Sequence, residues 1–198
     1  MEKNILGLIV GKGPGEAALR FTHSSRTDVT LCKELGQVLS NLCNVVPDGL
    51  VCFFASFKAL DHFLANWASR AAIEAKKKVF AGHGHSHDQP KIFIEGTGGG
   101  PQETEKMLKN YQHAIFASHG ALLLAVMGGR LSEGVNFSDR LARAVIIVGQ
   151  PYPNLKDPET AERVLYYTRL QDDASAGAEY LENICMRSVN QTIGISFT

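Results

Sequence analysis

Three uninterrupted apolar runs constrain the fold of this chain more than any other feature. They cover residues 50–54, 121–126 and 144–148. None of them alternates apolar with polar residues, so each predicts a strand that is buried on both faces, as in a parallel sheet covered by helices. Two further short runs predict strands over residues 6–10 and 91–95.

Stretches with apolar residues at helical spacing separate these runs. They predict helices over about residues 29–43 and 57–67, from Pro101, from Pro158 with Asp157 as its cap, and from about Ala176. Strands that alternate with helices are typical of a parallel sheet. We therefore predict an α/β fold, a doubly wound parallel sheet with helices on both faces. Because no repeat or clear linker divides residues 1–198, we expect one domain.

Charge and hydropathy exclude several classes of protein. Twenty basic and twenty acidic residues cancel, so no overall field attracts nucleic acid, although a local patch is possible. No apolar run approaches the roughly 20 residues of a membrane span, and the first residues lack the apolar core of a signal peptide. The sequence thus predicts an intracellular protein without a membrane partner. The cysteines lie within apolar patterns without a C-x-x-C pair and predict buried, reduced thiols: Cys32, Cys43, Cys52 and Cys185.

Two local motifs invite a functional interpretation that their residues do not support. The glycine-rich segment 11–15 departs from both phosphate-binding patterns, because neither Ser nor Thr follows Lys12 and because Glu16 replaces the last glycine, so we predict a plain turn. His83, His85 and His87 alternate with small and polar residues. Without a cysteine or a second ligand pair nearby, they predict a flexible surface insertion, with a zinc or nickel site as the alternative.

The segment between the last two apolar runs is the most informative for function. It is rich in glycine and polar residues, and it follows a predicted strand, where parallel α/β sheets bind their ligands. "SEGVNFSD" at 132–139 and "AVIIVGQPYPN" at 144–154 resemble motif V and the next strand of the superfamily 2 iron–sulfur DNA helicases. The likeness is greatest to the ChlR-like branch, with the FancJ and XPD helicases more distant.

The resemblance extends along nearly the whole chain. "LGLIVGKGP" at 6–14 resembles the entry to the second motor domain of ChlR-like helicases, "LSNLCNVVPDGLVCFFASF" at 39–57 resembles motif IV, and "ENICMRSVNQTIG" at 182–194 resembles the start of motif VI. The resemblance implies a RecA-like second motor domain of a nuclear, ATP-dependent 5'→3' helicase that serves DNA repair and sister chromatid cohesion. It implies ATP with Mg²⁺ between two motor domains, and single-stranded or forked DNA across both. The iron–sulfur cluster and both Walker motifs belong to the first motor domain and are not in this chain.

The resemblance also implies roles for individual residues. Ser56 and Phe57 would contact the DNA backbone, together with Arg130, although Ser56 is also a candidate helix cap. The residues implied in nucleotide binding or its coupling to DNA are Gly129, Arg130, Glu133, Gly134, Asn136, Gln191 and Gly194. For Asn136 a hydrogen bond that stabilises the loop is the alternative. No residue is expected to ligate a metal.

Motif VI departs from the family pattern Gln-x-x-Gly-Arg-x-x-Arg. Ile195 stands where the first arginine is expected, and Thr198 stands where the second is expected. We therefore expect a second motor domain that is incomplete at its C-terminus, cut within motif VI, and inactive as an isolated chain. A non-catalytic isoform that binds DNA or a partner protein is the alternative.

Overall fold

The computed structural model describes residues 5–22, 25, 28–68, 91–98, 100–117, 120–135, 137, 139–170, 173 and 175–194. The predictions for His83, His85 and His87 lie outside the described residues, as do those for Asn136, Ile195 and Thr198.

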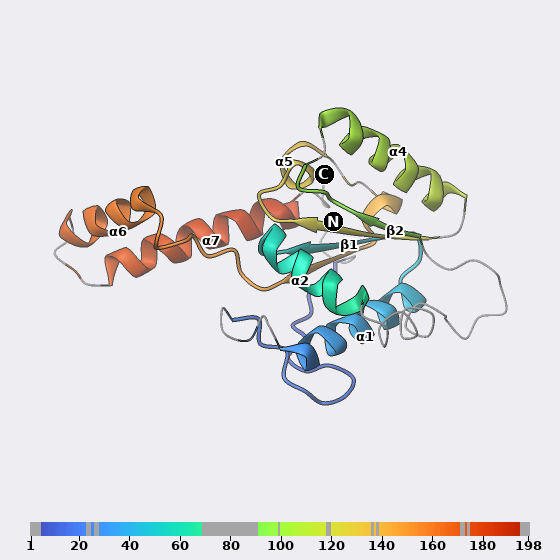
Figure 1. The fold of residues 1–198 in the computed structure, drawn as a ribbon, viewed down its shortest axis with the longest axis horizontal. Helices are drawn as coiled ribbons and strands as arrows, with labels where there is room; N and C mark the ends of the chain where they lie inside the picture. Colours follow the sequence, from blue (N-terminus) through green and yellow to red (C-terminus); the bar gives the residue numbers. More distant parts are fainter. Residues whose placement is uncertain are drawn as a thin grey trace.

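Four parallel strands form one sheet in the order β2-β3-β1-β4 (Figure 1). They are β1 (Gly49–Phe54), β2 (Lys91–Ile94), β3 (Ala121–Val126) and β4 (Ala144–Val148). Every residue of the central strands β1 and β3 is buried, whereas β2 and β4, at the edges of the sheet, are partly exposed. The parallel sheet and these four strands were predicted from the apolar runs, and the structure confirms them.

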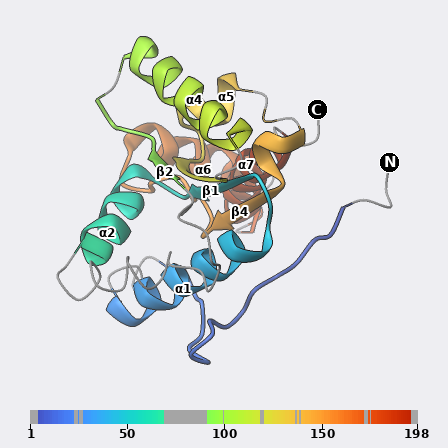
Figure 2. The ribbon, with the colours of Figure 1, turned by 90° about the vertical axis from the view of Figure 1, so that its right-hand side faces the viewer.

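Helices cover both faces of this sheet, which confirms the doubly wound α/β class. Helices α1 (Val29–Val45) and α2 (Phe57–Ala68) lie on one side, and α4 (Pro101–Phe116) lies on the other (Figures 1 and 2). Successive strand residues point to opposite faces. Cys52 and Phe54 accordingly pack in the cluster of α1 and α2, whereas Val51 and Phe53 pack in the cluster of α4. A short helix α5 (Arg130–Gly134) and the 3-10 helix η3 (Asp139–Ala142) complete the second face.

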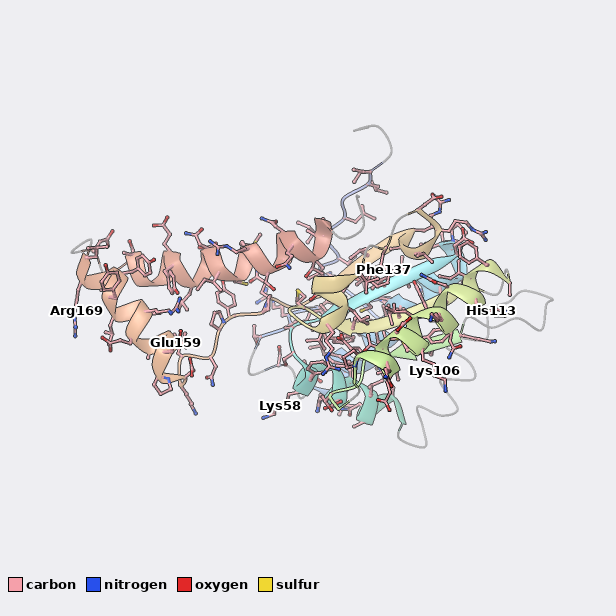
Figure 3. All side chains as sticks on the ribbon, turned by 90° about the horizontal axis from the view of Figure 1, so that it is seen from above. Lys58, Lys106, His113, Phe137, Glu159 and Arg169 are labelled. Carbon is pink, nitrogen blue, oxygen red and sulfur yellow. The ribbon has the colours of Figure 1, made fainter. Side chains whose placement is uncertain are left out.

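Helices α6 (Pro158–Leu170) and α7 (Ala176–Gly194) form a hairpin that extends beyond the sheet (Figure 1). In Figure 3, Glu159 and Arg169 lie on α6, well away from the strands. Tyr167 of α6 stacks on Tyr180 of α7 with ring centroids 4.4 Å apart. No described residue of α6 is buried, and Leu165, at helical spacing from Ala161 and Thr168, is 45% exposed. The reason is that α6 packs mainly on α7 and not on the sheet.

The strand expected over residues 6–10 does not form. Those residues are extended but unpaired, and Ile9 is fully exposed, because no strand among the described residues hydrogen-bonds to them. The plain turn expected at residues 11–15 is confirmed by the hydrogen bond from the Glu16 amide to the Gly13 carbonyl, at 3.0 Å. The buried Glu34 carboxylate attaches this turn to α1, because it accepts from the Gly15 amide at 2.8 Å.

The four cysteines are free thiols, as expected. Cys32, Cys52 and Cys185 are buried, while Cys43 is half-buried. Among the described residues, no helix combines the length and the apolar character that crossing a membrane requires.

Candidate functional site

The carboxyl edge of the sheet brings together two of the segments in which site residues were predicted. Strands β1 and β3 pair directly, with Phe54 opposite Val126 at their ends. Because the strands are parallel, the residues that follow them lie at the same edge, where α/β sheets bind ligands. Ser56 and Phe57 follow β1, and residues 128–130 follow β3. The motif IV and motif V segments therefore lie at the same edge of the sheet.

Ser56 caps helix α2. Its Oγ accepts a hydrogen bond from the Ala59 amide at 3.2 Å, and its carbonyl accepts one from the Leu60 amide at 3.1 Å. The helix-cap interpretation is thus confirmed. The hydroxyl still has its own proton to donate, since a serine offers one donor beside its acceptor positions. Phe57 is half-buried and packs against the core on the face of α1 and α2. The proposed DNA contacts of both residues stay predictions.

A tight turn connects β3 to α5. The Gly129 amide donates to the Val126 carbonyl at 3.0 Å, and Gly128 has a φ of +70°, which favours glycine. Gly129 is needed for a different reason. A Cβ atom there would lie 2.8 and 2.9 Å from the two carboxylate oxygens of Glu95, and 2.9 Å from the Val126 carbonyl oxygen. Crowding within the protein, rather than the approach of a ligand, explains this glycine.

Glu95 is the residue that sequence reasoning missed. It follows β2 directly and is only 5% exposed. Its Oε2 accepts from the Val126 amide at 2.9 Å, and its Oε1 accepts from the Leu131 amide at 3.3 Å. The sequence pattern predicts Glu95 only as the last residue of a strand. The available signal was a carboxylate placed directly after a strand, at the edge where ligands bind.

Arg130 begins α5 and is exposed, although Gly129, Leu131 and Ser132 around it are all buried. Its backbone is held in place, since the Ser132 hydroxyl donates to the Gly129 carbonyl at 2.9 Å. No ion pair of Arg130 is found in the part of the chain that the structure describes. Its guanidinium is therefore available to an anion such as a phosphate.

A second exposed cation lies near this edge. Lys58, on the first turn of α2, extends into solvent, and sequence reasoning did not select it (Figure 3). It lies two positions after Ser56, so both side chains belong to the segment that follows β1.

Helix α7 brings the motif VI residues close to motif V, because its C-terminal part contacts α5. Val189 packs in the same apolar cluster as Leu131, and Thr192 is buried. Gln191 and Gly194 are exposed on the last turns. Glu133 and Gly134 lie in α5, but their side chains are outside the described residues. The nucleotide contacts of all these residues remain predictions.

The described residues at this edge do not form a complete phosphate cradle. A phosphate cradle needs several free backbone amides, as in a P-loop. Here the amides of Val126 and Leu131 are already occupied by the Glu95 carboxylate. Among the described residues predicted to bind nucleotide, the exposed polar side chains are the Arg130 guanidinium and the Gln191 amide. Among the described residues, no group of three or more His, Cys, Asp or Glu side chains could hold a metal ion.

The opposite, amino edge of the sheet is closed by ion pairs. Asp48 adopts a φ of +66° in the turn before β1, and its Oδ1 accepts from Arg140 Nη2 at 2.7 Å. Arg143 lies near the other carboxylate oxygen, with its Nε at 3.8 Å. The hydrogen bond from Arg140 is the main reason that the pKa of Asp48 lies below its usual range. The Pro-Asp-Gly sequence at 47–49 by itself predicts only a turn.

Comparison with known proteins agrees with this arrangement. The helicase C-terminal domain family matches residues 39–194. The ATP-dependent DNA helicase DDX11 of Mus musculus is 39% identical over 96% of this chain, and the ATP-dependent DNA helicase chl1 of Schizosaccharomyces pombe is 36% identical over 97%. The chain spans about a fifth of the length of these relatives (21% and 22%).

Solved structures support the fold. An XPD helicase structure matches with a TM-score of 0.58 at 16% identity, over 89% of this chain and 27% of that one. The S. tokodaii Xpd4 structure matches with a TM-score of 0.52 at 15% identity, over 89% and 29%. The resemblance stated from the sequence motifs is confirmed: this RecA-like chain belongs to the helicase C-terminal domain family, and its relatives are helicases of the ChlR-like branch.

Proposed function

We propose that this chain works as the second motor domain of an ATP-dependent 5'→3' DNA helicase in nuclear genome maintenance. In this role it contacts single-stranded or forked DNA and forms one wall of an ATP site that a first motor domain completes. The observation that carries the proposal is Arg130, an exposed cation held between buried residues at the carboxyl edge of the sheet. The relatives of this chain, DDX11 and chl1, are named as ATP-dependent DNA helicases.

The DNA contact follows from the chemistry of this edge. Ser56 can donate its hydroxyl proton to a phosphate while it still caps α2, because the cap uses only an acceptor position of its oxygen. Lys58 and Arg130 add two exposed positive charges to the segments after β1 and β3. Contacts of this kind fix the position of a nucleic acid strand without reading its sequence. We therefore expect weak binding that depends strongly on salt.

This chain supplies only part of the ATP site. ATP with Mg²⁺ would lie against the side of the chain that carries Arg130 and Gln191, and the first motor domain would supply the Walker motifs. Ile195 and Thr198 stand at the positions of the motif VI arginines, and neither carries a positive charge. Arginines that act on the transferred phosphate contribute roughly 10³- to 10⁵-fold in rate in other NTPases. The isolated chain is therefore expected to lack ATPase activity.

DNA binding is tested by fluorescence anisotropy with a labelled oligo-dT over a series of NaCl concentrations. Ser56→Ala and Arg130→Ala should each weaken binding, and the double variant should weaken it further. Lys91→Ala is the matched control, because it removes one exposed cation at the start of β2, on the opposite edge of the sheet. If the double variant binds as tightly as the wild type, the proposed DNA surface is wrong.

ATP hydrolysis is tested on the same preparation, with and without DNA. We expect no DNA-stimulated turnover above a mock purification. Turnover that disappears in Glu133→Gln or Gln191→Ala would contradict the proposal, since it would require a complete catalytic site within this chain.

A second candidate is a non-catalytic module that binds DNA or a partner of the helicase. The uncharged residues Ile195 and Thr198 favour it. Mixing the chain with a separately purified first motor domain of a DDX11 relative distinguishes the two. Tighter binding of an ATP analogue by the mixture than by the first motor domain alone supports the motor domain, and a complex without this gain supports the module.

A further inference from the structure

Glu95 connects the end of β2 to the segment that follows β3. Its carboxylate is buried, and its two hydrogen bonds come from backbone amides, those of Val126 and Leu131. No ion pair of Glu95 occurs in the described part of the chain. A buried carboxylate is unfavourable unless its oxygens are well compensated. The two amides that compensate the Glu95 carboxylate therefore show which segment it stabilises.

The two amides bracket the motif V turn. Val126 is the last residue of β3 and Leu131 is the second residue of α5, so the residues between them are 127–130. One carboxylate thus holds both ends of the turn. It also packs against the turn itself, because a Cβ at Gly129 would meet its oxygens at 2.8 and 2.9 Å. These contacts of Glu95 therefore fix the position of the Arg130 backbone.

We propose that Glu95 is a positioning residue, which holds the motif V turn so that Arg130 meets the phosphate backbone of single-stranded DNA. This inference rests on the DNA contact in the proposed function. Glu95 acts through backbone hydrogen bonds and is not an ion-pair partner of Arg130 among the described residues. It leaves the guanidinium free for a phosphate while it fixes the base of the side chain.

Whether removal of Glu95 weakens or strengthens DNA binding distinguishes a positioning role from an effect of its negative charge alone. If Glu95 acted only through its negative charge, its removal would strengthen the attraction for DNA phosphates. If it positions Arg130, its removal weakens binding, because the guanidinium is no longer held toward the strand. A purely structural role would lower the stability of the fold without changing how DNA binding responds to salt.

The test is the slope of log K against log [NaCl] for oligo-dT binding by the full chain. Each phosphate contact with single-stranded DNA contributes about 0.7 to this slope. We expect Arg130→Ala to lower the slope by about 0.7, Glu95→Ala to lower it equally, and the double variant to lower it no further. Glu103→Ala is the matched control, since it removes an exposed carboxylate from the first turn of α4 and should leave the slope unchanged.

Glu95→Gln is a second variant for the case in which Glu95→Ala does not fold. It preserves the size of the side chain and one acceptor oxygen, and circular dichroism shows whether each variant is folded. If Glu95→Ala is unfolded, the slope of Glu95→Gln decides, and we expect it to fall below that of the wild type.

Three results would overturn the inference. If Arg130→Ala lowers the slope and the folded Glu95 variants keep the wild-type slope, the inference is wrong and the proposed function stands. Tighter binding by the Glu95 variants would show that only the charge matters. If the wild-type chain does not bind oligo-dT at all, the proposed function fails and the inference fails with it.

Discussion

The adjacent glycines of motif V should respond very differently to the same substitution. Gly128 has a φ of +70° and open space where a Cβ would be, so Gly128→Ala meets only the strain of a left-handed backbone, about 1 kcal/mol. Gly129 has an ordinary φ of −82°, but its Cβ would crowd two Glu95 oxygens and a backbone carbonyl within 2.8–2.9 Å. Overpacking typically costs about 1 to 3 kcal/mol, and three close contacts at once place Gly129→Ala toward the upper end of this range.

Glu95 provides the internal control. In a Glu95→Ala background two of the three close contacts of the Gly129→Ala methyl group disappear, and only the Val126 carbonyl oxygen remains near it. The second substitution should then be about 1 kcal/mol less destabilising than it is alone. Gly128→Ala has no contact with Glu95 to lose, so its coupling to Glu95→Ala should be smaller than that of Gly129→Ala.

The assay is urea unfolding followed by the fluorescence of Trp67, the single tryptophan, which packs against the core of α1 and α2. The free energy of unfolding is compared across the wild type, the three single variants and the two double variants. Equal losses for Gly128→Ala and Gly129→Ala would refute the steric argument. Strict additivity of Glu95→Ala and Gly129→Ala would refute it as well.

Three further predictions concern the rest of the fold. Tyr111→Phe should lower the free energy of unfolding by about 1 to 3 kcal/mol, because the buried hydroxyl donates to a backbone carbonyl of η3 at 2.6 Å; an unchanged urea midpoint would contradict this. The hydrogen bond from Arg140 lowers the pKa of Asp48, so this group stabilises the fold above its unfolded pKa of about 3.9, and the stabilisation is lost as the pH falls through the lower folded value. Asp48→Asn should therefore flatten the acid side of a urea-midpoint profile, and a profile parallel to that of the wild type would count against it. Burial raises the pKa of Cys32 to about 11 and that of Cys43 to about 12, so both thiols should react slowly with a disulfide reagent at pH 8 until urea unfolds the chain; fast labelling of the native protein would show that they are accessible.

Local sequence patterns predicted the parts of this fold that local physics determines. The strands over 121–126 and 144–148 have the predicted bounds, but only 121–126 is buried throughout, because 144–148 lies at an edge of the sheet and is partly exposed. Asp157 accepts from the Thr160 amide at 3.0 Å and begins α6 as expected. Residues 6–10 have the same apolar character and form no strand, because a strand needs a partner and the pattern does not say whether one exists.

The contacts that organise the candidate site join residues far apart in sequence, and this is why they were not predicted. The hydrogen bond from the Val126 amide to Glu95 spans 31 positions, and the bond from Arg140 to Asp48 spans 92. Neither pair has a spacing that repeats or a motif of its own. Predicting them requires the strand order β2-β3-β1-β4, which places the residue after β2 beside the end of β3. Strand order is decided by packing of the whole sheet.

We expect substitutions at the two edges of the sheet to have different effects. At the amino edge the carboxylate of Asp48 is matched by Arg140 and Arg143, so the charges there are satisfied within the protein. At the carboxyl edge the carboxylate of Glu95 is matched by backbone amides instead, and this leaves the nearby cation Arg130 without an ion pair among the described residues. Substitutions at Asp48 should therefore change the unfolding midpoint and leave DNA binding intact. Substitutions at Arg130 should leave the unfolding midpoint unchanged and weaken DNA binding. A side chain without an ion pair among the described residues contributes little to the fold and is free to bind a phosphate.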